Sequence, residues 1–552
     1  MRRSTGSADR LSLLAILAVV SASVAYLLYL GRRTSFFYDE WTWIVGRRGW
    51  APPNFLLSHN GHFVALPVLV YHLLFALVGL HAYLPYRLVL MATHAVLCLL
   101  LYYYARPRVG PWLAVVAGGS LCLIGPAYQD LVWPFQISFI GALLFGLAAL
   151  LALDRAGEAG RDRWALVFLL AAIACSGAGL AMLAGAGVRI IGRRQWRRWW
   201  IVAIPAAGFG LWYLGYGGLP PHNSDLGQRL GYAVKEFRAG IGGLTGHPAT
   251  SAVGLAAGGS VLVLALVLAR LALALSRRRL PVELLSTITV AAALLGLTAI
   301  ARTGYHDFGA SRYLYSTGFA IILVLADTLA GVRWRGPLSL GLGLAVALAV
   351  WTGLPVLRAN TVALSNVDTY VRADLAAVDQ LKSPPRRYLI NRRVVPSLTI
   401  GQYLSIRSDL GSPAMPFSAI TRQSPGVRDD VDRILRQAGG LTLSTVRAPG
   451  ARLDPLPVPD RLVRLSLPPG CRRVSGPAGV EVVLVLPAGG ITMRGSRSQI
   501  VILVNRFGPT RARLAALSQG GWHHLTGSAD SSPVPWTTEI LSADQVDICR
   551  TA

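Results

Sequence analysis

Long apolar runs recur along residues 11–357 and constrain the fold of this chain more than any other feature. A run of about 20 apolar residues can cross the hydrocarbon core of a bilayer as a helix. We therefore predict a polytopic α-helical membrane protein with about eleven transmembrane helices. The expected spans are 11–30, 85–105, 111–127, 137–153, 164–178, 179–193, 199–216, 250–275, 281–300, 313–331 and 337–357. The chain is 53% hydrophobic and 14% charged, which excludes a soluble enzyme, a disordered protein and a secreted disulfide scaffold.

Two apolar stretches need separate interpretation. Residues 164–193 form one long run, and we interpret its break at residues 176–179 as a tight turn at the membrane surface. Residues 63–80 include polar side chains, and counting them as a span would invert every later loop. We expect residues 63–80 to form a helix that lies along the membrane surface.

The distribution of basic residues predicts the orientation. The net charge is +27, and nearly all of the positive charge is arginine, because Lys235 and Lys382 are the only lysines. With the N-terminus inside, the predicted cytoplasmic segments carry about twice as many basic residues as the opposite loops, in agreement with the positive-inside rule. The arginines form no continuous stripe, so we expect no nucleic-acid partner. Eleven spans then place the C-terminus outside the cytoplasm.

Residues 358–552 differ in composition from the rest and predict a separate extracytoplasmic α+β domain. Charged residues and prolines return at Arg358. Apolar spacing predicts helices at 362–382 and 428–437, and strands at 480–486, 499–504 and 511–517. We expect the strands to form a β-sandwich-like module. Cys471 and Cys549 could pair outside the cell, although their spacing does not decide whether they meet.

Three outer segments contain ionisable groups that solvation alone does not explain. The first follows the first span and places an acidic pair among aromatic residues. Its notable members are Tyr38, Asp39, Glu40, Trp41, His59 and His62. Aromatic residues are expected at a membrane interface, but an acidic pair among them is not, because burying a carboxylate without a partner is costly.

The second and third segments follow later spans on the same predicted face. Residues 125–136 include Asp130, Trp133 and Gln136, and residues 301–315 include Arg302, His306, Arg312 and Tyr313. Carboxylates from two loops would thus face guanidinium groups from a third. A carboxylate can take the proton from an attacking hydroxyl, and arginines can hold a departing phosphate through paired N–H donors.

Three short motifs occupy characteristic positions relative to the predicted spans. They are Tyr38-Asp39-Glu40-Trp41 after the first span, Asp130 in the second outer loop, and Ser311-Arg312-Tyr313-Leu314 at the mouth of a late span. In this arrangement residues 11–357 resemble the GT-C superfamily of integral membrane glycosyltransferases, which includes protein mannosyltransferases, aminoarabinose transferases and arabinofuranosyltransferases. The resemblance implies an inverting transferase at the outer face of a bacterial plasma membrane. Its donor would be a polyprenyl-phosphate-linked monosaccharide, and its acceptor a glycan, glycolipid or protein.

The resemblance also implies roles for individual residues. Asp39 would be the general base, while Glu40 and Asp130 would orient the acceptor or hold a divalent cation. This cation is the one cofactor that the resemblance leaves possible. The residues implied for the donor phosphate are Arg302, His306, Arg312 and Tyr313. The residues implied for other substrate contacts are Tyr38, Trp41, His59, His62, Trp133 and Gln136. The catalytic domain would span residues 1–357, and residues 358–552 are a candidate glycan-binding module.

Simpler interpretations stay open at this point. The acidic pair could be a solvated interfacial pair, Asp130 could cap a helix, and the arginines could anchor the chain to lipid headgroups. Two other functions compete with the transferase. A lipid or polysaccharide transporter would place ionisable groups near mid-membrane, and a non-catalytic scaffold would bind a wall polymer through its outer domain.

Overall fold

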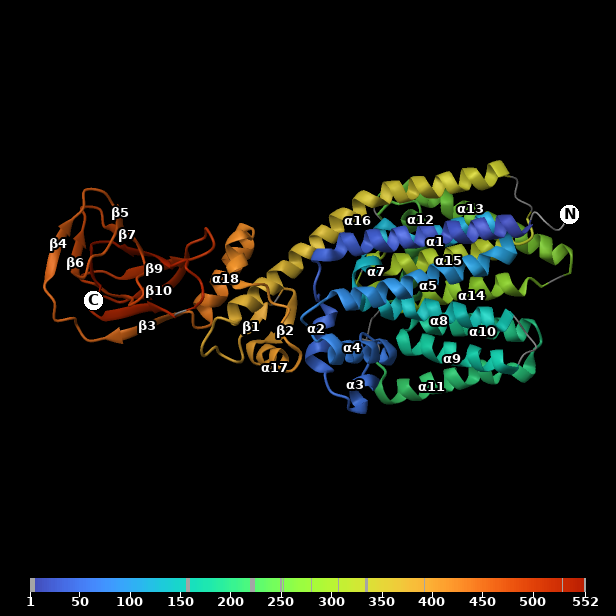
Figure 1. Ribbon diagram of the computed structural model, residues 1–552, viewed down its shortest axis with the longest axis horizontal. Helices are drawn as coiled ribbons and strands as arrows, with labels where there is room; N and C mark the ends of the chain where they lie inside the picture. The colour runs from blue at the N-terminus through green and yellow to red at the C-terminus, as the bar shows by residue number, and fades with distance from the viewer. Residues whose placement is uncertain are drawn as a thin grey trace. The chain divides into compact units, whose positions relative to one another are not determined.

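The chain folds into two compact units (Figure 1). The helical unit comprises Met1–Thr34 and Gly46–Ser365, and the mixed unit comprises Ser35–Val45 and Asn366–Ala552. The computed structural model describes residues 5–154, 159–218, 224–248, 251, 253–278, 280–305, 307–332, 336–391, 393–528 and 530–550. The mixed unit therefore includes a short segment from near the N-terminus, in addition to most of the domain expected at 358–552.

Helices form nearly all of the described helical unit, and its long helices lie side by side as a bundle (Figure 1). The α-helices are α1 (Thr5–Leu30), α3 (Pro52–Leu56), α4 (Ala65–Val78), α5 (Leu84–Val109), α6 (Pro111–Cys122), α7 (Tyr128–Val132), α8 (Ile137–Asp154), α9 (Ala159–Cys175), α10 (Ala178–Gly192), α11 (Trp200–Tyr216), α12 (Leu226–Leu244), α13 (Val253–Ser276), α14 (Val282–Arg302), α15 (Ser311–Thr328) and α16 (Gly336–Val378). Short 3-10 helices are η1 (Gly31–Arg33), η2 (Gly125–Ala127), η3 (Pro134–Gln136), η4 (Trp196–Arg198) and η5 (Thr303–Tyr305). Each predicted span overlaps a helix of this unit, and the span expected at 111–127 is divided between α6 and η2.

Several of these helices are long and apolar enough for a bilayer, which indicates a membrane protein. Within the described ranges, six helices are long and apolar enough to cross a membrane, and a seventh span is formed if a bent pair is counted as one. The six are Ser7–Arg33, Leu84–Val109, Pro134–Asp154, Val253–Ser276, Val282–Tyr305 and Ser339–Val378, and the bent pair is Pro111–Cys122 with Gly125–Val132. The number of eleven spans and their orientation stay predictions.

At the break in the bent pair, the backbone at Gly125 lies close to the backbone of α16. The pieces before and after the break differ in direction by 47°. A Cβ atom at Gly125 would lie 2.0 Å from the carbonyl oxygen of Gly353 in α16, so only glycine fits at this contact. The bend turns α7, which carries Asp130, away from the axis of α6.

The two stretches that needed interpretation are both helical where expected. α9 ends at Cys175 and α10 begins at Ala178, so the run at 164–193 is broken at the predicted turn. A Cβ at Gly179 would lie 2.4 Å from the backbone of Ala172, which explains why a small residue follows the turn. α4 occupies most of residues 63–80, whereas its position along a membrane surface stays a prediction.

The mixed unit combines the C-terminal part of α16 with short helices and two larger sheets. Its helices are α2 (Asp39–Gly46), α17 (Ile400–Leu410), η6 (Phe417–Arg422) and α18 (Pro425–Gln437). Its strands are β1 (Leu389–Asn391), β2 (Val395–Thr399), β3 (Leu441–Val446), β4 (Leu453–Pro457), β5 (Leu462–Leu465), β6 (Gly470–Ser475), β7 (Val480–Val485), β8 (Ile491–Gly495), β9 (Ile500–Asn505), β10 (Ala512–Leu517), β11 (Trp522–Gly527), β12 (Thr537–Ser542) and β13 (Gln545–Arg550). The strand orders are β10-β9-β12-β7-β5 and β3-β11-β8-β13-β6-β4, and β1 pairs with β2.

The predicted secondary structure of the C-terminal region is largely confirmed. The strands expected at 480–486, 499–504 and 511–517 are β7, β9 and β10, and the helix expected at 428–437 lies within α18. The helix expected at 362–382 is not separate, because α16 continues from the last predicted span to Val378. The polar residues after Arg358 change the composition but do not interrupt helical hydrogen bonding.

The two cysteines whose pairing the sequence left open form a disulfide. Cys471 in β6 lies directly opposite Cys549 in β13, and the bond closes a loop between residues 78 positions apart. The disulfide packs against buried Trp522 in a small apolar cluster. Strand register therefore decides the pairing that the spacing left open.

Candidate functional site

Two of the three predicted outer segments meet in the helical unit. The backbone N–H of Gln129 in α7 donates a 3.0 Å hydrogen bond to Oγ of Ser311, the first residue of α15. The next residue along each segment, Asp130 and Arg312, interact electrostatically. An acid and a guanidinium that are 182 positions apart in the sequence therefore share one end of the helical unit.

Asp130 is the acid that most needs an explanation. Its side chain is 0% exposed, and neither carboxylate oxygen has a hydrogen-bond partner among the described residues. An ionised carboxylate buried in this way is costly unless a charge or a ligand compensates it. The positive charge of Arg312 supplies part of that compensation, and a bound hydroxyl group could supply the missing hydrogen bond.

Arg312 is held by a second acid. Its Nη2 lies 2.9 Å from Oδ2 of Asp307, and Oδ1 of Asp307 accepts a 3.3 Å hydrogen bond from the hydroxyl of Tyr232. The guanidinium also lies over the ring of Tyr313, at 5.1 Å from the centroid. Arg302 lies 5.7 Å from the same centroid. Two guanidinium groups therefore flank Tyr313, and Asp307 orients one of them.

Sequence reasoning missed the acid that holds this loop. Oε2 of Glu236 in α12 accepts a 2.7 Å hydrogen bond from the backbone N–H of Gly309. Burial raises the pKa of Glu236 to about 7, and the negative charge of Asp307 adds to this effect. Glu236 lies in an amphipathic helix with no motif around it, so only its burial against the loop after α14 reveals it.

A cavity of about 220 Å³ opens beside Arg302 and Tyr313 and is also lined by His62 and Phe139. Nδ1 of His62 accepts a 3.2 Å hydrogen bond from the backbone N–H of Gly177, in the turn between α9 and α10. Loss of hydration, together with the charges of Arg302, His59 and Arg312, lowers the pKa of His62 to about 4. The imidazole is therefore neutral at pH 7, and the positive charge beside this cavity comes from the arginines.

The remaining substrate-contact candidates of the helical unit surround the same region. His59 pairs with His62 through two backbone hydrogen bonds, and its ring lies 5.2 Å from that of Phe135. Trp133 stacks on Phe135 at 5.0 Å. Gln136 is buried, and its Oε1 has no hydrogen-bond partner in the described part of the chain. His306 lies outside the described residues.

The acidic motif belongs to the mixed unit. Asp39 begins α2 and is partly exposed, whereas Glu40 is buried and its Oε2 accepts a 2.8 Å hydrogen bond from the N–H of Phe37. Trp41 is also buried, and its indole N–H donates to the carbonyl of Phe36 at 3.1 Å. Tyr38 is 50% exposed. The predicted meeting of Asp39 with Arg312 stays a prediction.

Among the described residues, no group of three or more His, Cys, Asp or Glu side chains is arranged to hold a metal ion.

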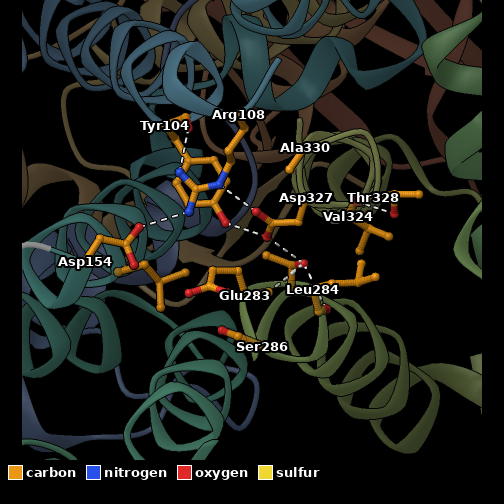
Figure 2. Close-up of polar contacts among 12 residues, drawn as sticks. Tyr104, Arg108, Asp154, Glu283, Leu284, Ser286, Val324, Asp327, Thr328 and Ala330 are labelled. Carbon is orange, nitrogen blue, oxygen red and sulfur yellow. Dashed lines mark hydrogen bonds and ion pairs between the residues drawn. The ribbon is translucent and has the colours of Figure 1, made fainter. Parts of the chain in front are cut away.

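A second polar cluster, which sequence reasoning missed, joins residues near the C-terminal ends of α5, α8, α10 and α15, and Figure 2 shows part of it. Arg108 bridges Asp154, at the end of α8, and Asp327, near the end of α15. Arg189 in α10 is 1% exposed and pairs with Asp154. Sixteen residues of α15 separate Ser311 from Asp327, or roughly 24 Å at 1.5 Å per residue. Arg189 and Asp327 are charged residues within predicted spans, and this is the sequence signal that could have revealed the cluster.

Comparisons of the chain with known family models, curated proteins and solved structures found no match.

Proposed function

We propose that this protein is an inverting membrane glycosyltransferase. It would move a monosaccharide from a polyprenyl-phosphate donor to a hydroxyl of a cell-envelope acceptor on the extracytoplasmic face. The observation that carries the proposal is the pair of guanidinium groups that flank Tyr313, with the buried carboxylate of Asp130 beside them. A phosphate needs such cations most when it leaves, because its negative charge is then greatest.

The proposed reaction is a single displacement. Asp39 takes the proton from the acceptor hydroxyl as the oxygen attacks the anomeric carbon. The bond between that carbon and the phosphate oxygen breaks, and polyprenyl phosphate leaves with the electron pair. Attack from the face opposite the leaving group inverts the anomeric configuration.

The remaining groups have supporting roles in this mechanism. Arg302 and Arg312 bind the phosphate, and Asp307 keeps Arg312 oriented before the donor arrives. Neutral His62, whose Nδ1 accepts from Gly177, carries its proton on Nε2 and can donate a hydrogen bond there without adding charge to the site. Asp130 can accept a hydrogen bond from a sugar or acceptor hydroxyl, which would satisfy an oxygen that has no partner among the described residues.

The transporter alternative predicts a different distribution of charge. It requires ionisable groups near the middle of the membrane. The partly buried Asp154 and the buried Arg189 and Asp327 instead lie at or near the C-terminal ends of their helices. This placement favours a role in holding helix ends together.

The decisive experiment measures transfer by the purified full-length protein in lipid nanodiscs. Synthetic polyprenyl-phosphate pentoses and hexoses serve as donors, and cell-envelope glycans serve as acceptors. Asp39→Asn should lower kcat by about 100-fold or more, because a general base contributes roughly 10²–10⁴ to the rate. Asp460→Asn is the matched control, because Asp460 is an exposed acid of the same unit.

Normal turnover by Asp39→Asn would refute the catalytic assignment. No transfer from any donor, combined with flux of a lipid-linked sugar across proteoliposomes, would refute the transferase in favour of a transporter.

A further inference from the structure

A buried carboxylate in α16 contacts the acidic segment of the mixed unit. Asp368 is 1% exposed, and its Oδ2 accepts a 2.8 Å hydrogen bond from the backbone N–H of Ser35. Its Oδ1 is buried and has no hydrogen-bond partner within the described ranges. Asp368 thus fixes the beginning of the segment that carries Asp39.

Glu40 provides a second attachment within the same segment. Its side chain is 0% exposed, and Oε2 accepts the 2.8 Å hydrogen bond from the N–H of Phe37. Tyr38 lies between Phe37 and the first residue of α2, and its φ of 43° is in the left-handed region. A residue other than glycine rarely adopts this conformation, and it persists where the surrounding structure holds the backbone. Asp39 is the next residue, so the two carboxylates hold the backbone just before it.

The charges around Asp368 make a purely stabilising role a poor explanation. Glu40 and Asp368 are close enough to interact electrostatically, and both are buried acids. Arg372, one helical turn after Asp368, supplies the nearby positive charge, and its Nε donates to the carbonyl of Pro413 at 3.1 Å. Burying two carboxylates near each other is costly to fold, so a simple packing role would be better served by apolar residues.

We propose that Asp368 is a positioning residue that holds residues 35–40 so that Asp39 is presented in one fixed conformation. The proposal rests on the proposed function for the role of Asp39 as the base. It assigns the C-terminal end of α16 a part in catalysis, although Asp368 itself contacts neither substrate nor product.

The first readout is independent of activity. Hydrogen–deuterium exchange is measured on the full-length protein in nanodiscs, in peptides that cover residues 35–45. Asp368→Ala should raise the exchange rate of the Ser35 amide by about tenfold or more, because its acceptor is removed. Asp368→Asn should raise it less, because the amide oxygen can still accept the bond. Asp460→Ala, at an exposed acid of the same unit, should leave these peptides unchanged.

The second readout is the split between kcat and KM. Asp368→Ala should lower kcat by about tenfold and change both KM values by less than about twofold, and Asp368→Asn should restore most of the rate. If Asp368→Ala does not fold, Asp368→Glu serves instead, because it keeps the charge but moves the carboxylate by one methylene group.

The outcomes separate the two proposals. Unchanged exchange in both Asp368→Ala and Asp368→Glu overturns the positioning role, whatever the activity. Faster exchange with normal kcat also overturns it. If exchange is faster in the variants but the wild-type protein transfers no sugar, the proposed function is refuted. The catalytic role of Asp368 is then refuted as well, and Asp368 keeps only its role as the anchor of this segment.

Discussion

The ionic cluster at the C-terminal end of α15 allows a quantitative test of what holds the helical unit together. Asp327 is buried and accepts hydrogen bonds from the hydroxyls of Tyr104, at 2.7 Å, and Thr287, at 3.0 Å. It also pairs with Nε of Arg108, whose Nη2 lies 2.9 Å from Asp154 (Figure 2). One carboxylate therefore joins α15 to α5 and α14.

The expected magnitude follows from what each substitution leaves behind. Asp327→Leu removes the acceptor of three buried donors and leaves Arg108 with one acidic partner fewer. Breaking one side of a buried ion pair costs about 3–5 kcal/mol. Arg108→Met should cost a similar amount, because it leaves Asp327 and Asp154 without this cation. The double variant removes both charges and should cost at least about 2 kcal/mol less than the sum of the single variants.

The assay is thermal unfolding of the purified protein in nanodiscs, followed by intrinsic fluorescence. Each single variant should lower the apparent Tm by roughly 6–20 °C, given about 2–4 °C per kcal/mol for a domain of 150–250 residues. Arg277→Met is the control, because Arg277 is an exposed arginine, and it should change the Tm little. Single variants that cost less than about 1 kcal/mol, or costs that add fully, would refute the idea that this cluster is a coupled structural tie.

Two further predictions concern pH and the disulfide. His62 has a pKa near 4 in the folded protein against an ordinary 6.5, so the unfolded chain binds more protons between these values and stability should fall as the pH decreases from about 6.5 to about 4. Unfolding at pH 7.5 and pH 5 should show a loss on the order of 1–2 kcal/mol in the wild type that His62→Gln lacks; equal pH dependence in both would contradict the assignment. Replacing both Cys471 and Cys549 by Ser should destabilise the mixed unit by about 2–4 kcal/mol in denaturant unfolding, and a reductant should lower the wild-type stability to that of the variant. No change in either measurement would show that the disulfide contributes little.

Some features of the candidate site could be read from the sequence and others could not. Asp130 and Arg312 stand out because each is a charged residue beside an apolar run, next to aromatic residues. Glu236 does not stand out, since acids in amphipathic helices are common. Its importance appears once the backbone N–H of Gly309 is seen to bind it.

The acidic segment also has features that the sequence shows and features that it does not show. Its sequence marks Asp39 and Glu40 by their aromatic neighbours, but its assignment to the unit that contains Asn366–Ala552 depends on contacts across more than 300 positions. Asp368 lies in a helix whose sequence gives no reason to associate it with Ser35. Sequence periodicity reports which face of an element is buried and does not report what covers that face.

The sequence alone determined the long apolar helices, the tight turn between α9 and α10, and strands β7, β9 and β10, because hydrophobic period and run length are local properties. Tertiary structure alone decided the disulfide register, the continuation of α16 into the mixed unit, and the partners of Arg108, Arg312 and Asp368. A buried charge is stable only with a partner, and the chain can bring that partner from any distance along its length. Its identity is therefore a property of the packed molecule.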